Sequence, residues 1–176
     1  MPNVYSTASL EGINTLLTYT AYDQTAAISS TNDPSNPGPP FAIGTTCESV
    51  NGGEFMFVKA SSAIAQYDFV GISTNFNAAS LSVSTTSLAP IVACAQVAIA
   101  SGSYGWVCLR GGGISGNVLA SAVAGAALYA TATAGSLDDA AFSSLQPKID
   151  GVVCTTTKNS IAGNTPVLMS YPTIVV

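Results

Sequence analysis

The sequence predicts an all-β fold, a small β-barrel or β-sandwich that carries an extended N-terminal arm. From Cys47 onward, short runs of β-branched and aromatic residues alternate with glycine and polar turns, which is typical of these folds. Residues 32–40 contain four prolines, which remove backbone donors and fix φ, so this stretch forms neither a helix nor a central strand. We therefore divide the chain into an arm with a Pro-rich linker, residues 1–46, and a β body, residues 47–176.

The arm is apolar and is separated from the body by a stiff linker, so we expect it to contact a neighbouring subunit. An arm that folds back onto its own domain is the alternative. Leu10, Ile13 and Leu17 have helical spacing and predict a short helix. The side chains expected to make the contacts are aromatic or aliphatic: Tyr5, Leu10, Ile13, Leu16, Leu17, Tyr19 and Tyr22.

Nine short strands are expected in the body, each rich in β-branched or aromatic residues. They are residues 54–59, 69–72, 81–84, 90–100, 104–109, 128–131, 151–156, 167–169 and 173–176. Residues 101–102 suggest a tight hairpin turn, and the three glycines at 111–113 are expected to end the strand that follows it.

In the strand expected at 104–109, large apolar side chains occur at both odd and even positions, which predicts burial on both faces of the strand. Tyr104, Trp106 and Cys108 share one face, whereas Val107 and Leu109 share the other. Trp106 is the only tryptophan, and we expect it to fill the core, with carbohydrate stacking as the alternative.

Charge is scarce in this chain. Charged residues make up 7% and hydrophobic residues 48%, so the surface suits close packing against other subunits better than free solution. Four Lys and Arg against nine Asp and Glu leave a net charge of −5, which excludes a basic patch for nucleic acid.

Histidine is absent, which removes the commonest general base and the commonest metal ligand. We therefore expect no enzymatic activity, no cofactor and no bound metal.

The four cysteines lack CxxC spacing and are expected to be buried thiols that stay reduced. They are Cys47, Cys94, Cys108 and Cys154. Cys94 and Cys108 lie on adjacent expected strands, so they are the pair most able to bridge.

Three polar groupings are weaker candidates for chemistry. Asp138 and Asp139 are adjacent, but neighbours on an extended chain point apart, so a solvated turn is expected there. Arg110 precedes glycines whose N–H groups could surround an anion, although a strand end is the simpler interpretation. Glu48 and Glu54 flank a glycine turn, but two carboxylates alone make a poor calcium loop.

No membrane association is expected. The N-terminus lacks the charged start and apolar core of a signal peptide, so we expect assembly in the cytoplasm. Residues 111–137 are uncharged but rich in alanine and interrupted by glycine and threonine, which argues against a transmembrane helix.

Several short motifs follow one another along the chain: FMFVKA (55–60), AQVAIASGSYGWV (95–107), the glycines from 111, LY (128–129), AGSLDD (134–139) and IDGVV (149–153). Their order resembles that of small head-decoration (cement) proteins of tailed phages. The resemblance covers residues 54–155. It implies a virion protein that binds the outer surface of the capsid, commonly as a homotrimer, with the major capsid protein as its partner. A head-fibre, tail-fibre or other appendage protein with an adhesion or carbohydrate-binding role is the alternative.

If the arm serves attachment, deleting residues 1–31 should leave a folded body and weaken capsid binding. The arm's apolar surface would be lost from the contact at roughly 25 cal/mol per Å².

Overall fold

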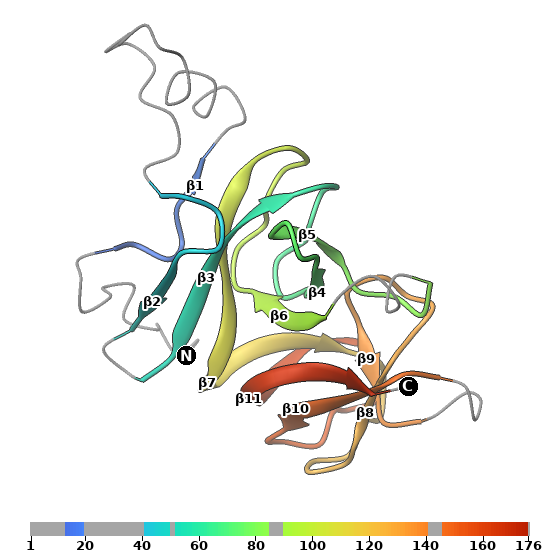
Figure 1. Cartoon of the computed structure of the whole chain (residues 1–176). Helices are drawn as coiled ribbons and strands as arrows, with labels where there is room; N and C mark the ends of the chain where they lie inside the picture. The colour runs from blue at the N-terminus through green and yellow to red at the C-terminus, as the bar shows by residue number, and fades with distance from the viewer. Residues whose placement is uncertain (1–12, 20–40, 50–51, 85–89, 141–145, 176) are drawn as a thin grey trace, which may run out of the picture.

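A computed structural model describes residues 13–19, 41–49, 52–84, 90–140 and 146–175 of the chain. These residues contain strands and turns but no helix, so the all-β prediction is confirmed (Figure 1). The strands are β1 (Thr18–Tyr19), β2 (Thr46–Glu48), β3 (Glu54–Ala60), β4 (Phe69–Ile72), β5 (Asn77–Ser80), β6 (Ile91–Ala95), β7 (Tyr104–Val118), β8 (Leu128–Ala130), β9 (Leu137–Asp138), β10 (Lys148–Cys154) and β11 (Gly163–Val175).

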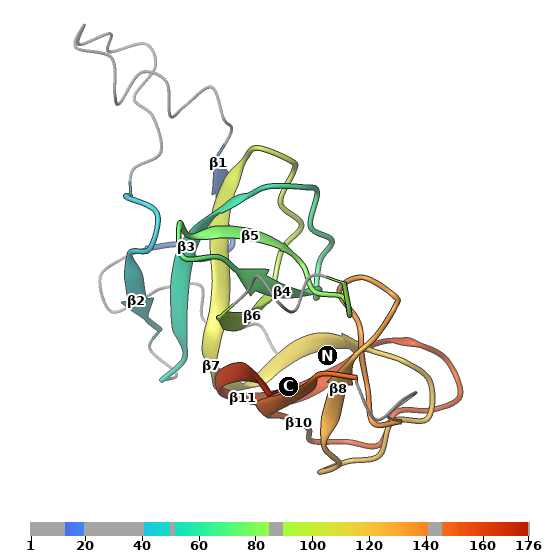
Figure 2. The ribbon, with the colours of Figure 1, turned by 45° about the vertical axis from the view of Figure 1, so that its right-hand side comes forward.

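The long strand β7 belongs to two lobes. In the first lobe the pairings run from β7 through β6, β4, β5 and β3 and return to β7, which closes a five-stranded barrel. In the second lobe they run from β7 through β11, β10, β8 and β9 and again return to β7. Figures 1 and 2 show β7 leaving the barrel and continuing beside β11 in the second lobe.

The glycines at 111–113 do not end this strand, so that prediction was wrong. β7 continues through them to Val118, with positive φ at Gly111 and Gly113. The register of both neighbours shifts here, between Glu54 and Phe55 in β3 and between Val167 and Met169 in β11. Glycines at such irregularities let a strand bend sharply. The bend passes β7 from one lobe to the other.

Other strand boundaries also differ from expectation. The strand expected at 81–84 is β5, at Asn77–Ser80, and Leu81 after it is a fully buried core residue outside the sheet. The apolar residue at position 81 therefore indicates a buried side chain and not a paired β-strand. The strand expected at 167–169 and the described part of the strand expected at 173–176 both belong to the single strand β11, Gly163–Val175.

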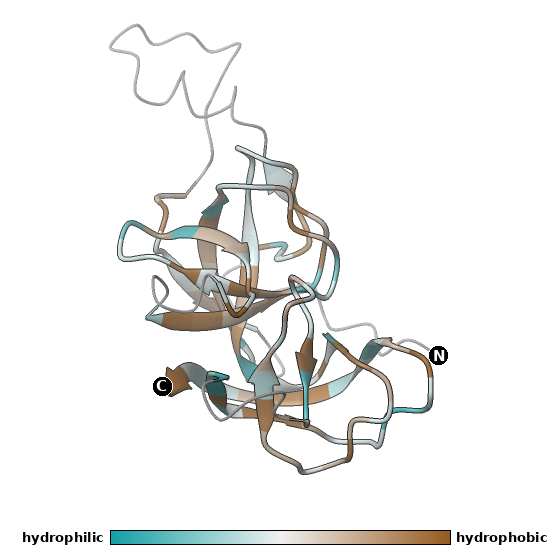
Figure 3. Ribbon diagram, turned by 90° about the vertical axis from the view of Figure 1, so that its right-hand side faces the viewer, coloured by the Kyte–Doolittle hydropathy of each residue, from teal (hydrophilic) through white to brown (hydrophobic). Residues whose placement is uncertain are grey.

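Two hydrophobic clusters lie on opposite faces of the β3–β7 pair, and the predicted alternation is confirmed. One cluster fills the barrel and includes Val58, Ile72, Ala93 and Val107 of the barrel strands. The other includes Trp106 on the outside of the barrel and continues into the second lobe. Figure 3 shows hydrophobic residues along the strands of both lobes. Since β7 contributes to both clusters, both of its faces are buried.

Asp68 joins the lobes at their junction. Its Oδ2 accepts hydrogen bonds from Ala65 N at 3.1 Å and Ser80 Oγ at 2.7 Å. Its Oδ1 accepts a bond of 3.0 Å from Nδ2 of Asn117, which lies on the second-lobe half of β7. Gly135 packs directly against the carboxylate. A buried carboxylate with several donors is well satisfied, and this one ties β4, β5 and β7 together.

Candidate functional site

Residues 13–19, which we name the N-terminal hook, lie on the outside of the barrel. Ile13 and Tyr19 are half-buried and pack against the core cluster that contains Trp106. The ring of Tyr19 meets Phe57 edge-on with 5.8 Å between centroids, and β1 pairs with β7. Phe41, beyond the linker, packs 5.1 Å from Trp106. These residues help to bury the aromatic outer face of the barrel.

The four described side chains that were expected to make contacts therefore divide into two groups. Ile13 and Tyr19 fasten the hook to its own body, as the alternative interpretation of the arm requires. Leu16 and Leu17 are exposed by 39% and 48%. The remaining three expected contacts, Tyr5, Leu10 and Tyr22, lie outside the described residues.

The described part of the expected helix is a turn that leads into a strand. The side-chain oxygen of Asn14 accepts a 3.0 Å bond from Leu16 N, and its main-chain oxygen accepts a 3.2 Å bond from Leu17 N. Asparagine commonly stabilises such turns by bonding the backbone two residues ahead. The turn leaves both leucines exposed to solvent, whereas helical spacing would have grouped Ile13 with Leu17.

A second exposed apolar surface lies on β11. Thr165, Val167 and Met169 are buried, while Pro166 and Leu168 between them face solvent. Leu168 lies opposite Val153 of β10 and beside the exposed Gly112 of β7. The sequence reasoning missed this surface, although three consecutive apolar residues at 167–169 signal that one of them must point away from the core.

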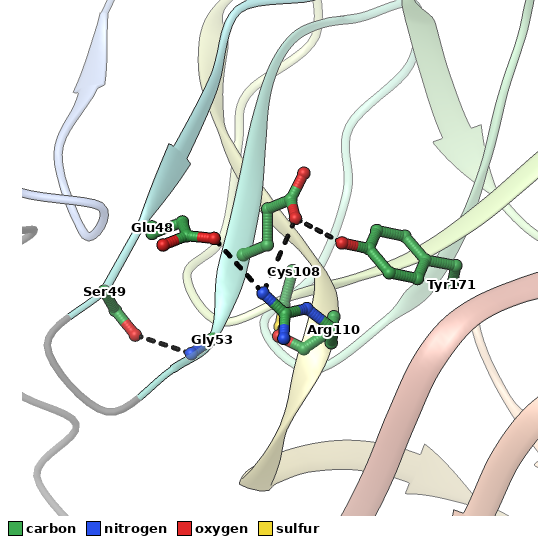
Figure 4. Close-up of polar contacts among 7 residues, drawn as sticks. Glu48, Ser49, Gly53, Cys108, Arg110 and Tyr171 are labelled. Carbon is green, nitrogen blue, oxygen red and sulfur yellow. Dashed lines mark hydrogen bonds and ion pairs between the residues drawn. The ribbon is translucent and has the colours of Figure 1, made fainter.

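Arg110 forms ion pairs with both carboxylates that had suggested a calcium loop, and Figure 4 shows its pairing with Glu48. Its Nη2 lies 3.3 Å from Glu48 Oε1 and 3.8 Å from Glu54 Oε2. The Tyr171 hydroxyl donates to Glu54, and the Tyr171 ring lies 5.7 Å from the guanidinium carbon. The bond to Glu54 raises the pKa of Tyr171. The polar candidates therefore engage each other, in a partly exposed cluster that contributes little to stability.

The aspartate pair is likewise engaged in local structure. Asp138 belongs to β9 and not to the expected turn, and burial raises its pKa. Asp139 accepts a 2.9 Å hydrogen bond from Val123 N.

Within the described residues no three His, Cys, Asp or Glu side chains group as a metal site would require. No helix in that part of the chain is long and apolar enough to cross a membrane.

All four cysteines are buried, as predicted, and the structure has them as free thiols. Burial raises the pKa of Cys108 to about 12 and the pKa of Cys94 well above its usual value. Since thiolate is the reactive form of cysteine, both side chains are chemically protected in the folded protein.

These raised pKa values predict a loss of stability in alkali. Because the folded protein keeps protons that the unfolded chain releases above pH 9, the stabilisation is complete below that pH and is lost as pH rises toward 12. The free energy of unfolding should fall by about 1.4 kcal/mol per pH unit for each such thiol. Urea unfolding of the wild type and of Cys108→Ala between pH 8.5 and 10.5 measures this. An equal slope for both proteins would contradict the assignment to Cys108.

No protein-family model and no curated protein matches this chain.

Proposed function

We propose that this chain is a structural virion protein that binds the outer surface of a phage capsid and stabilises the shell. The observation that carries the proposal is the hook, which is fastened to the barrel by Ile13 and Tyr19 and holds two adjacent leucines in solvent. Apolar side chains held outward on a rigid support suit the centre of a protein interface.

The remaining surface supports the same role. Further large apolar side chains are exposed on β11, namely Leu168, Tyr171 and Val175, and charged residues make up only 7% of the chain. A homotrimer would present three hooks to the major capsid protein at once. Several modest contacts made together bind far more tightly than one alone.

The leucines of the hook test this proposal. The double variant Leu16→Ser/Leu17→Ser should bind empty shells of the major capsid protein at least about tenfold more weakly, since each buried leucine contributes on the order of 1 kcal/mol or more. Co-sedimentation with shells at increasing protein concentration measures the affinity. The thermal midpoint should change little, because both side chains are exposed.

Val123→Ser is the matched control. Val123 is exposed by 51%, close to the value for Leu17, but it lies in the second lobe. This variant should bind shells like the wild type. If the leucine variant also binds normally, the hook is not the attachment surface, and the same measurement on Leu168→Ser would test β11.

A further inference from the structure

Cys94 and Cys108 lie directly opposite each other on the antiparallel strands β6 and β7. Both side chains belong to the same core cluster, so they project from the same face of the sheet. We propose that these two cysteines form a disulfide bond when the chain folds under oxidising conditions, which would staple β6 to β7 in the wall of the barrel.

The register of the two strands suits the Cα separation that this bond needs. Directly opposed residues on antiparallel strands have Cα atoms about 4.5 or 5.5 Å apart, depending on the hydrogen-bonding position. Disulfides span Cα separations of about 4.4–6.8 Å, and both of these separations lie within that range. Cys47 lies opposite Phe55 and Cys154 opposite Val167, so neither of these positions faces a cysteine.

Only the side chains must turn. The Cys94 thiol donates to Ser115 O at 3.2 Å, and the Cys108 thiol donates to Arg110 O at 3.2 Å. Rotation about the Cα–Cβ bonds exchanges these weak hydrogen bonds, and the 3.6 Å bond from Cys94 Sγ to Tyr67 O, for one covalent bond. The Gln96 amide also contacts the Cys94 sulfur at 3.4 Å and helps to enclose it.

The chemistry needs an oxidant, and a small disulfide such as oxidised glutathione is sufficient. One cysteine thiolate attacks it, forms a mixed disulfide and releases one glutathione thiolate. The second cysteine thiolate then attacks the mixed disulfide and releases the other, so the protein loses two protons and two electrons and glutathione gains them. Burial holds both thiols protonated in the folded state. The exchange therefore belongs to folding, before β6 closes on β7.

The test compares full-length protein produced in a host with a reducing cytoplasm and in one with an oxidising cytoplasm. The second preparation should be 2 Da lighter per chain, with Cys94 and Cys108 joined in its non-reduced peptide map. Because the bond closes a 15-residue loop (residues 94–108), the thermal midpoint should rise by roughly 5–10 °C and return on reduction.

Cys94→Ala is the control, and its two preparations should have equal mass and equal midpoints. Four thiols per chain in the oxidised wild type, titrated after unfolding, would overturn the proposal. So would a bond that joins Cys47 to Cys154 or links two chains in place of the predicted one. The bond does not depend on whether the protein binds a capsid.

Discussion

Replacing Gly135 with alanine is expected to lower the free energy of unfolding by at least about 3 kcal/mol, through combined steric, backbone and hydrogen-bond effects. A Cβ atom at this position would lie 2.2 Å from the Asp68 Cγ atom. The backbone cannot shift to relieve the contact, since Gly135 N donates to Leu81 O at 2.8 Å and Gly135 O accepts from Phe69 N at 2.9 Å. The carboxylate must therefore leave its donors at the junction of the lobes.

Gly125→Ala separates this contact from backbone strain. The two glycines have nearly the same φ, +78° at Gly135 and +75° at Gly125, but a Cβ at Gly125 would meet nothing within 4 Å. The Gly125 variant should lose only about 1–2 kcal/mol, the cost of a left-handed backbone for alanine. Urea unfolding monitored by Trp106 fluorescence measures both variants. Equal losses would show that Asp68 is not held as described.

Trp106→Ala is expected to cost about 3–5 kcal/mol, as is usual for a large aromatic side chain removed from a core. Trp106 is fully buried and packs with its ring 5.1 Å from both Phe41 and Phe57. Its loss would open a cavity between the barrel and the segments that cover it. Circular dichroism during urea unfolding provides the measurement, because this variant has no tryptophan.

Trp106→Phe is the informative comparison. The indole Nε1 is buried and has no hydrogen-bond partner among the residues that the structure describes, so phenylalanine would remove a donor that is unsatisfied there while keeping an aromatic ring. We expect this variant to lose less than half of what alanine loses. A similar loss for both variants would contradict this expectation.

The position of the hook changes the expectation for the N-terminal deletion. Removing residues 1–31 also removes Ile13, Tyr19 and β1, which cover the barrel's aromatic face. We now expect the truncated chain to lose stability as well as capsid binding. For this reason the exposed leucines, and not the deletion, test attachment.

The sequence by itself determined the fold class, much of the core and the burial of the cysteines. Alternation at 104–109 placed Trp106 on one buried face and Val107 on the other, because side-chain direction in a strand follows from position alone. The shortage of charge and the absence of histidine are properties of composition that no fold can alter.

Only the tertiary structure decided how these elements combine. The glycines at 111–113 locally predict the end of a strand. Because β7 has a paired strand on each side of it, the strand bends there and continues. Whether the hook packs on its own barrel, and whether Arg110 meets Glu48 and Glu54 or an outside anion, depends on residues distant in the chain. Local patterns specify which way a side chain points, whereas the partner it meets depends on the closure of the sheet.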